Sequence, residues 1–121
     1  MPGDLVLWFN PRCGTCQRAL ELLRERGYEP QLRRYLEDPP TVTELRELLS
    51  KLGLPPHAVA RSSEDEYQAM RLSERTPHDG MLQALAQHPL ILQRPILVRG
   101  DRAVIARPAE RVLEFVQPES P

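Results

Sequence analysis

Hydrophobic and polar positions along the first third of the chain follow two different periods. Residues 5–9 form a short, nearly all-apolar run, which is typical of a strand buried on both faces of a sheet. Residues 14–26 place their apolar side chains on one side, as an amphipathic helix does, and Gly27 is suited to a left-handed cap. Residues 31–35 follow as a second strand. A strand, a helix and a strand over this length predict a βαβ unit with parallel strands.

The middle of the chain is predicted to be a helical insert. Thr41 and Glu44 have the spacing of a capping box, directly after the break at residues 38–40. Leucines then recur at helical intervals up to Gly53, and we interpret them as core positions. These leucines are Leu45, Leu48, Leu49 and Leu52. The expected helices cover residues 41–53, 56–61, 64–72 and 79–87, with Asp79 capping the last of them.

The last third of the chain predicts a hairpin and a final helix. Residues 95–98 and 103–106 are apolar runs joined by the turn at 99–102, which indicates two antiparallel strands. Pro108 suits the first position of a helix that carries Val112, Leu113 and Val116. The predicted fold class is therefore α/β, with a four-stranded mixed sheet (βαβ, then ββα) and a helical insert. No repeat or internal boundary appears, so we expect residues 1–121 to form a single domain.

Composition and charge narrow the possible partners. The 121 residues carry a formal net charge of −1, so no overall field draws the protein to nucleic acid or to a membrane surface. The chain has no apolar run long enough for a transmembrane helix, and its beginning lacks the pattern of a secretory signal. We therefore expect a cytoplasmic protein that binds neither nucleic acid nor membranes.

The two cysteines, Cys13 and Cys16, form a single Cys-x-x-Cys pair. The cytosol keeps thiols reduced, so this pair is not a disulfide framework. It is at best half of a zinc site, because the three histidines lie far away in sequence without ligand spacing. We therefore expect neither a metal nor a bound cofactor, and we assign His78 and His88 structural roles.

Cys13 is placed where a strand passes into a helix, and such a position favours the thiolate, which is the reactive form of cysteine. Arg12 and Arg18 are close in sequence and would add positive potential, while Asn10 would orient the loop through its own backbone. Cys16 follows on the same helical face, where it could attack an adduct on Cys13 and close an intramolecular disulfide. Two ordinary buried thiols are the alternative interpretation.

Two arginines flank the predicted hairpin. Arg94 precedes the third strand and Arg107 follows the fourth, so either could approach the Cys13 loop and clamp an oxyanion. Their positions alone fit solvated surface arginines as well. The Arg94–Pro95 bond is a possible cis peptide, although trans is the general expectation for a bond to proline.

Five short motifs stand together in a fixed order and spacing. They are Asn10-Pro11-Arg12-Cys13-Gly14-Thr15, Tyr35-Leu36-Glu37-Asp38-Pro39-Pro40-Thr41, His88-Pro89-Leu90-Ile91, Arg94-Pro95-Ile96 and Arg107-Pro108-Ala109-Glu110. Through them the chain resembles the glutaredoxin-coupled arsenate reductase (ArsC) family over essentially its whole length. The resemblance implies a thioredoxin-like fold with a helical insert.

The resemblance also implies a reaction and a set of site residues. Cys13 corresponds to the cysteine that attacks arsenate, and Arg61, Arg94 and Arg107 correspond to three arginines that hold the oxyanion. Pro95 corresponds to the cis-proline beside the active site. No cofactor is bound in such enzymes; glutathione or a protein thiol is the co-substrate, and glutaredoxin or thioredoxin restores Cys13. We expect the protein to act as a monomer.

Two positions depart from the family pattern and leave alternatives open. Phe9 stands where many members have histidine, and Cys16 stands where the glutathione-dependent type has a different residue. Cys16 could replace glutathione as the resolving thiol, which would favour thioredoxin as the reductant. A general thiol–disulfide oxidoreductase is one alternative function. A redox-sensing regulator resembling Spx, which would bind RNA polymerase, is another, although Arg107 and the helix start after it favour an enzyme.

Overall fold

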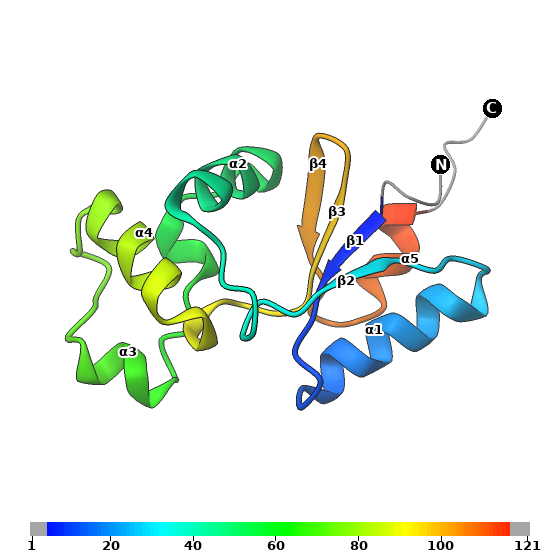
Figure 1. Cartoon of the computed structure of the whole chain (residues 1–121), viewed down its shortest axis with the longest axis horizontal. Helices are drawn as coiled ribbons and strands as arrows, with labels where there is room; N and C mark the ends of the chain where they lie inside the picture. The colour runs from blue at the N-terminus through cyan, green and yellow to red at the C-terminus, as the bar shows by residue number, and fades with distance from the viewer. Residues whose placement is uncertain (1–4, 117–121) are drawn as a thin grey trace. The chain divides into compact units, whose positions relative to one another are not determined.

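A computed structural model describes residues 5–116 of the chain (Figure 1). The described chain forms two compact units. The sheet unit comprises the described residues up to Arg34 and those from Arg94 onward, and the helical unit comprises Tyr35–Gln93. In chain order, the elements are β1 (Leu5–Trp8), α1 (Gly14–Glu25), β2 (Gln31–Arg33), α2 (Val42–Leu52), the 3₁₀ turn η2 (Pro56–Val59), α3 (Asp65–Ala69), α4 (His78–Gln87), the 3₁₀ turn η3 (Pro89–Ile91), β3 (Ile96–Arg99), β4 (Arg102–Ile105) and α5 (Arg111–Val116).

The sheet has the mixed arrangement that the sequence predicts. Its strand order is β2-β1-β3-β4, with β1 and β2 parallel and the two other pairs antiparallel. Leu7 in the central strand is opposite Leu32 on one side and Leu97 on the other. Phe9 lies just beyond β1, where its N–H still donates to the carbonyl of Arg33 at 2.8 Å. The predicted α/β class and the mixed sheet are thus confirmed.

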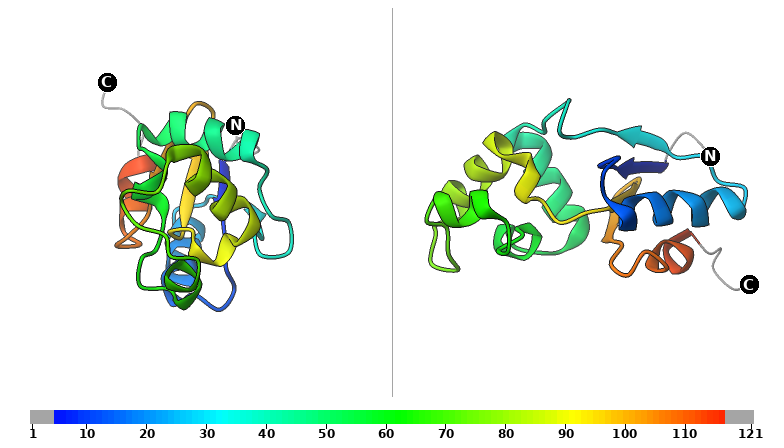
Figure 2. Two further views of the ribbon diagram at one scale, coloured as in Figure 1. Left: turned by 90° about the vertical axis from the view of Figure 1, so that its left-hand side faces the viewer. Right: turned by 90° about the horizontal axis from the view of Figure 1, so that it is seen from below.

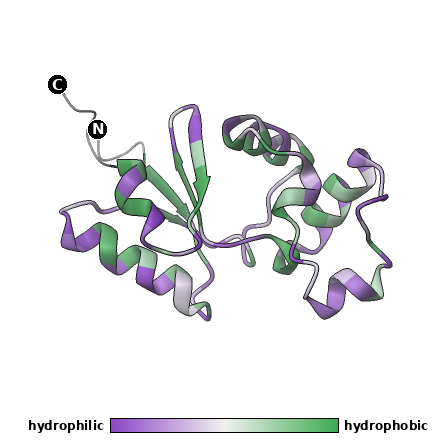
Figure 3. Ribbon diagram, turned by 180° about the vertical axis from the view of Figure 1, so that it is seen from behind, coloured by the Kyte–Doolittle hydropathy of each residue, from purple (hydrophilic) through white to green (hydrophobic). Residues whose placement is uncertain are grey.

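Helices α1 and α5 pack beside each other in the core of the sheet unit (Figure 2). The alternation of β1 directs Leu5, Leu7 and Phe9 into the core that these helices share. Leu23 of α1 and Val112 of α5 have no exposed surface in this core. The strands of the sheet are mostly hydrophobic in Figure 3, whereas α1 alternates hydrophobic and hydrophilic positions. Burial of one helix face against the sheet therefore fixes the beginning of α1 beside the end of β1.

Helix α1 ends as the sequence predicts. Gly27 has φ +84°, and its N–H donates to the carbonyl of Arg24, while the N–H of Tyr28 donates to Leu23. These two bonds form a Schellman motif, in which glycine adopts the left-handed conformation without a Cβ penalty. The hydroxyl of Tyr28 then donates to the carbonyl of Val116 at 3.0 Å and ties this turn to α5.

The helical unit is built around α2 and α4, with η2 and η3 against α4. Thr41 and Glu44 form the predicted capping box: the Thr41 hydroxyl accepts from the Glu44 N–H, and the Glu44 carboxylate accepts from the Thr41 N–H, both at 3.1 Å. Gly53 ends α2 in the left-handed conformation at φ +70°. Leu45, Leu48 and Leu49 are buried as predicted, whereas Leu52 is only half-buried.

Two predicted helix starts are wrong. The first carbonyl of α4 to accept a helical hydrogen bond belongs to Pro77, which receives the N–H of Met81 at 2.9 Å. Asp79 therefore lies inside the first turn, where its carboxylate pairs with Arg46 at 3.0 Å, and it is not the cap. Pro108 is not the first residue of α5, because a tight turn precedes this helix. The N–H of Arg111 donates to Pro108 within that turn.

The remaining differences concern the lengths of short elements. Helix α3 ends at Ala69 instead of Leu72, because Arg71 adopts the left-handed conformation (φ +57°) and closes a Schellman motif. The predicted helix over 56–61 is the shorter 3₁₀ turn η2. β2 ends at Arg33, so Tyr35 lies outside it, and the hairpin strands are shifted by one residue. Within residues 5–116, none of the helices combines the length and apolar character required to cross a membrane.

Candidate active site

Cys13 occupies the N-cap position of α1, where β1 passes into the helix. The Asn10 side chain is buried and shapes this loop, because its Oδ1 accepts from the backbone N–H of Arg12 at 2.9 Å. The carbonyl of Asn10 accepts from the N–H of Cys13 at 3.0 Å. Gln17 closes the loop from the helix side by donating its side-chain amide to the carbonyl of Pro11. The loop therefore presents a half-buried Cys13 thiol at the beginning of α1.

The surroundings of Cys13 favour its thiolate. Burial is the largest single influence and would by itself raise the pKa. Hydrogen bonds from the backbone N–H and the thiol of Cys16, from the Arg94 side chain and from the Thr15 backbone outweigh that influence. The pKa of Cys13 consequently lies below its ordinary value of 9.0. A larger fraction of Cys13 is therefore a nucleophilic thiolate near neutral pH than of an ordinary cysteine.

Cys16 has the opposite character. It has no exposed surface, and burial together with the neighbouring Cys13 raises the pKa of Cys16 to about 12, even though a backbone hydrogen bond at Asn10 acts the other way. Cys16 is thus a thiol that donates its hydrogen bond to the thiolate of Cys13. The sequence placed the two sulfurs on one face of the helix but did not indicate this donor role.

Arg94 and Arg107 both belong to the sheet unit, as Cys13 does. The Arg94 side chain reaches Cys13, and Arg107 donates from Nη1 to the backbone carbonyl of Arg94 at 2.8 Å. The peptide bonds that precede Pro95 and Pro108 are both cis. The two arginines that flank the hairpin therefore lie in one connected group with the nucleophile.

Arg12 and Arg18 contribute less to Cys13 than the sequence suggested. The arginine that lowers the pKa of Cys13 is Arg94. Arg12 is exposed, and Arg18 faces two carboxylates, those of Glu21 at 3.4 Å and Glu110 at 3.9 Å.

Arg61 lies in the helical unit, whereas Cys13 lies in the sheet unit. Its N–H donates to the carbonyl of Ile91 at 2.6 Å, and its Nε is 3.5 Å from Oε1 of Glu64. The Arg61 side chain is 20% exposed, so it retains access to solvent beside that carboxylate. Its role in holding an oxyanion stays a prediction.

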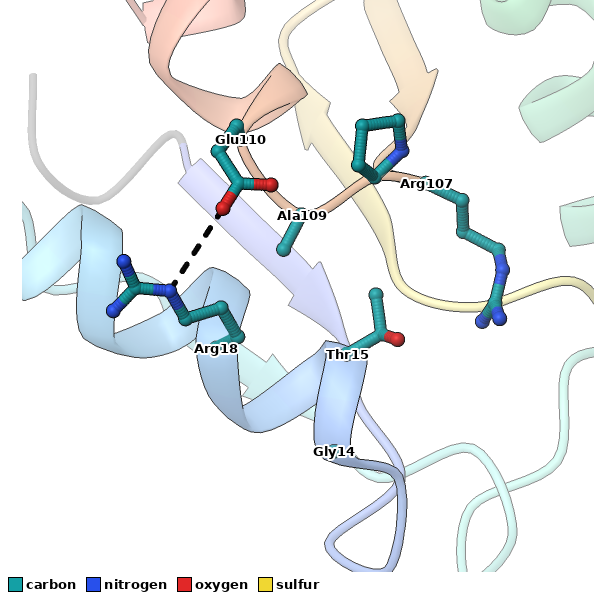
Figure 4. A pocket seen from close by; sticks show the side chains of 7 residues that line it. Gly14, Thr15, Arg18, Arg107, Ala109 and Glu110 are labelled. Atoms are coloured by element: carbon teal, nitrogen blue, oxygen red, sulfur yellow. Dashed lines mark ion pairs between the residues drawn. The ribbon is translucent and has the colours of Figure 1, made fainter.

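A cavity of about 510 Å³ opens in the sheet unit (Figure 4), and its lining begins with Gly14, the residue that follows Cys13. Gly14, Thr15 and Arg18 of α1 line one wall, and residues 107–110 line the other. In Figure 4, Arg18 and Arg107 lie on either side of Thr15 and Ala109, and Glu110 faces Arg18. The family resemblance assigned Arg107 to the site, and Thr15 belongs to the same motif as Cys13, but the sequence did not predict that Arg18 and Glu110 would meet at one cavity.

The histidines have partners that the sequence did not identify. His88 lies with Nδ1 3.3 Å from a carboxylate oxygen of Glu66, and His57 lies with Nε2 2.7 Å from the carbonyl of Thr76. The His57 and His78 rings are 5.5 Å apart. Among the residues that the structure describes, no three histidine, cysteine or acidic side chains are grouped to hold a metal ion.

The site places a cysteine thiolate next to the positively charged guanidinium group of an arginine. Cys13 is the nucleophile, Cys16 is a protonated neighbour that can form a disulfide with it, and Arg94 can stabilise negative charge beside the sulfur. These groups suit a reaction in which an anion receives electrons from thiols.

Known proteins resemble this chain in both sequence and fold. The sequence model of the ArsC family matches residues 8–115. An arsenate reductase of Escherichia coli K12 is 35% identical over 115 residues, which cover 94% of this chain and 82% of that relative. A solved putative arsenate reductase from Yersinia pestis is 41% identical with a TM-score of 0.87, covering 92% of this chain and 99% of that one. An arsenate reductase from Vibrio cholerae is 37% identical with a TM-score of 0.88, covering 93% and 97%.

Proposed function

The chain belongs to the ArsC family, and from this membership we propose that it reduces an arsenate-type oxyanion with Cys13 as the nucleophile. The observation that carries the proposal is the contact of Arg94 with a cysteine whose pKa is lowered. The same guanidinium that stabilises the Cys13 thiolate can pair with an incoming oxyanion. It thereby reduces the repulsion between two negative reactants.

The first step forms a bond between the Cys13 sulfur and arsenic(V). The thiolate supplies the electron pair, and one arsenic–oxygen bond breaks. The departing oxygen takes up a proton and leaves as water. Arg94 and Arg107 offset the negative charge that gathers on the remaining oxygens, which is electrostatic stabilisation of the transition state. We assign Arg61 to the same oxyanion, through its correspondence with the family's third arginine.

The second step releases arsenite. The Cys16 sulfur attacks Sγ of Cys13, and the sulfur–arsenic bond breaks with its electron pair passing to arsenic, which becomes arsenic(III). The proton of Cys16 passes to an arsenite oxygen, and a Cys13–Cys16 disulfide remains. The thiol of Cys16 already donates a hydrogen bond to Cys13, so the attacking sulfur is next to Sγ of Cys13 before the reaction begins. Cys16 is buried, so external thiols have less access to it than to half-buried Cys13.

An external thiol then restores the pair, through either glutaredoxin with glutathione or thioredoxin. Either route needs a reducing compartment, so we propose that the protein works in the cytoplasm. We also propose that it is a single-domain monomer with no bound cofactor. A general thiol–disulfide oxidoreductase is the second candidate function. The pairing of a Cys13 of lowered pKa with a buried Cys16 supports it, because disulfide exchange needs the same two thiols.

Arsenate turnover tests the proposal. Purified protein is assayed with arsenate and two reducing systems, glutathione with glutaredoxin and thioredoxin with its reductase. We expect arsenite formation with at least one system, loss of activity in Cys13→Ser, and a changed preference between the systems in Cys16→Ser. If neither system gives turnover while Cys13 is reduced and can be alkylated, the oxyanion assignment is wrong and disulfide substrates become the better candidates.

A further inference from the structure

Cys13 and Cys16 form an asymmetric pair of thiols. Cys13 is half-buried at the start of α1, so a small molecule can reach its sulfur, whereas Cys16 has no exposed surface. The thiol of Cys16 donates a hydrogen bond to the Cys13 sulfur, and the Arg94 side chain contacts the same sulfur. The accessible sulfur therefore has both a partner thiol and a guanidinium group as its neighbours.

We infer that this pair also reduces small hydroperoxides such as hydrogen peroxide, with Cys13 as the attacking thiolate, Cys16 as the resolving thiol and Arg94 as the donor to the departing oxygen. The activity goes beyond the proposed reduction of an oxyanion and does not depend on it. A hydroperoxide is a neutral electrophile, and negative charge develops on the oxygen that leaves. Its reduction needs a thiolate, a donor for that oxygen and a second thiol, which are the three groups gathered at Cys13.

The first step breaks the O–O bond. The Cys13 thiolate supplies an electron pair to one peroxide oxygen, a sulfur–oxygen bond forms, and the other oxygen takes up a proton and leaves as water. Cys13 becomes a sulfenic acid. A guanidinium group carries five N–H donors, so Arg94 can keep its contact with the sulfur and also donate to the departing oxygen. A donor placed where negative charge develops stabilises the transition state.

The second step uses the buried thiol. The Cys16 sulfur attacks Sγ of Cys13, the sulfur–oxygen bond breaks, and the departing hydroxide takes the proton of Cys16 and leaves as water. A Cys13–Cys16 disulfide remains, and the peroxide has received two electrons from two thiols. The external thiol that restores the pair after oxyanion reduction restores it here as well, so no further reductant is needed.

The charge of Cys13 keeps Cys16 protonated until the first step is complete. Burial is the main cause that raises the pKa of Cys16 to about 12, and the neighbouring Cys13 thiolate adds to it. Conversion of that thiolate to a sulfenic acid removes the negative charge from the Cys13 sulfur, so Cys16 then ionises more readily. The backbone hydrogen bond from Asn10, which lowers the pKa of Cys16, remains in place. Modification of Cys13 thus activates the thiol that resolves it.

The test compares peroxide with a reagent that also needs the thiolate. Reduced full-length protein is mixed with hydrogen peroxide in the absence of arsenate and other thiols, and the loss of the Cys13 thiol is followed by mass spectrometry. The rate constant is divided by that for iodoacetamide at the same pH, so the thiolate fraction cancels. The same ratio for 2-mercaptoethanol is the reference. We expect the protein ratio to exceed the reference at least about tenfold, as expected for one donor aimed at developing negative charge.

Substitutions separate the roles of the two neighbours. Arg94→Gln should lower the ratio about tenfold, and Arg94→Lys, which retains a charged donor, should give an intermediate value. Arg99→Gln is the matched control, because Arg99 ends β3 with its guanidinium group over the Tyr28 ring, and it should leave the ratio unchanged. Cys16→Ser should accumulate a Cys13 sulfenic acid that dimedone traps, whereas the wild type should form the disulfide.

Three results would overturn the inference. They are a wild-type ratio no higher than that of 2-mercaptoethanol, a raised ratio that Arg94→Gln leaves unchanged, and oxidation of wild-type Cys13 to sulfinic acid without a disulfide. If arsenate turnover is established while any of them is found, only the peroxide activity is wrong. If the peroxide results are as expected but no oxyanion is reduced, the peroxide activity stands and the oxyanion assignment fails.

Discussion

Replacing Cys16 by alanine tests how the Cys13 thiolate is stabilised. The substitution removes the thiol hydrogen bond to Cys13 and leaves the backbone N–H bonds and Arg94 in place. A hydrogen bond to a charged group contributes about 1.5–3 kcal/mol, and the partial exposure of Cys13 places the loss near the lower end. About 1.4 kcal/mol is a tenfold change in an equilibrium, so the thiolate fraction below the Cys13 midpoint should fall about tenfold. The remaining thiolate is roughly three-fold more nucleophilic because its pKa is higher. Alkylation of Cys13 should then slow about three-fold.

The assay is the pH profile of alkylation by iodoacetamide, read by mass spectrometry. In the wild-type protein only Cys13 should react at neutral pH, since Cys16 is buried with a pKa of about 12. In Cys16→Ala the midpoint should move to higher pH. Cys16→Ser is the matched control, because its hydroxyl can still donate and should keep the midpoint closer to that of the wild type. An unchanged midpoint in a folded Cys16→Ala protein would refute the donor role of Cys16.

Three further outcomes follow from individual contacts. The alkylation rate of wild-type Cys13 should rise with pH through a midpoint below 9.0, because a lowered pKa means that the thiol ionises earlier as pH rises; a midpoint at or above 9.0 would contradict the assignment. Thr41→Ala should lower the free energy of unfolding by about 1 kcal/mol in urea denaturation, because the Glu44 N–H loses its cap, whereas Thr43→Ala, at the second residue of the helix, should cost less. Gly53→Ala should cost about 1 kcal/mol in the same measurement, because alanine would have to adopt φ +70°; Gly14→Ala is the comparison, as Gly14 has no positive φ, and equal losses would argue against backbone strain.

Local patterns were sufficient to predict much of the fold. The apolar run at residues 5–9, the leucines of α2 and the glycines that end α1 and α2 are each decided by neighbours in sequence. The start of α5 was not, because the turn after Arg107 places two residues between Pro108 and Arg111. Asp79 was misassigned for a similar reason: it is a good capping residue, but Arg46 of another helix pairs with its carboxylate. An ion pair with a distant helix, which competes with a capping role, cannot be predicted from the sequence of one helix alone.

The site shows the same division between local and long-range information. The sequence placed Cys13 at a helix start and Cys16 on the same face, because both follow from the helical repeat. The contact of Arg94 with Cys13 depends on the pairing of β3 with β1, and the sequence alone fitted a surface arginine equally well. The facing of Arg18 and Glu110 across the cavity depends on α5 packing beside α1. Such contacts follow from tertiary packing and not from spacing.

A single-turnover experiment tests the role of Cys13 as the oxyanion nucleophile most directly. Fully reduced protein is mixed with arsenate in the absence of any other thiol, and both arsenite and remaining thiols are counted. The two thiols hold two electrons, so the wild-type protein should form one arsenite per chain, lose both titratable thiols and contain a Cys13–Cys16 disulfide. Cys13→Ser should form none. No arsenite from wild-type protein that retains both thiols, or equal arsenite from Cys13→Ser, would contradict the assignment of Cys13 as the nucleophile that reduces arsenate.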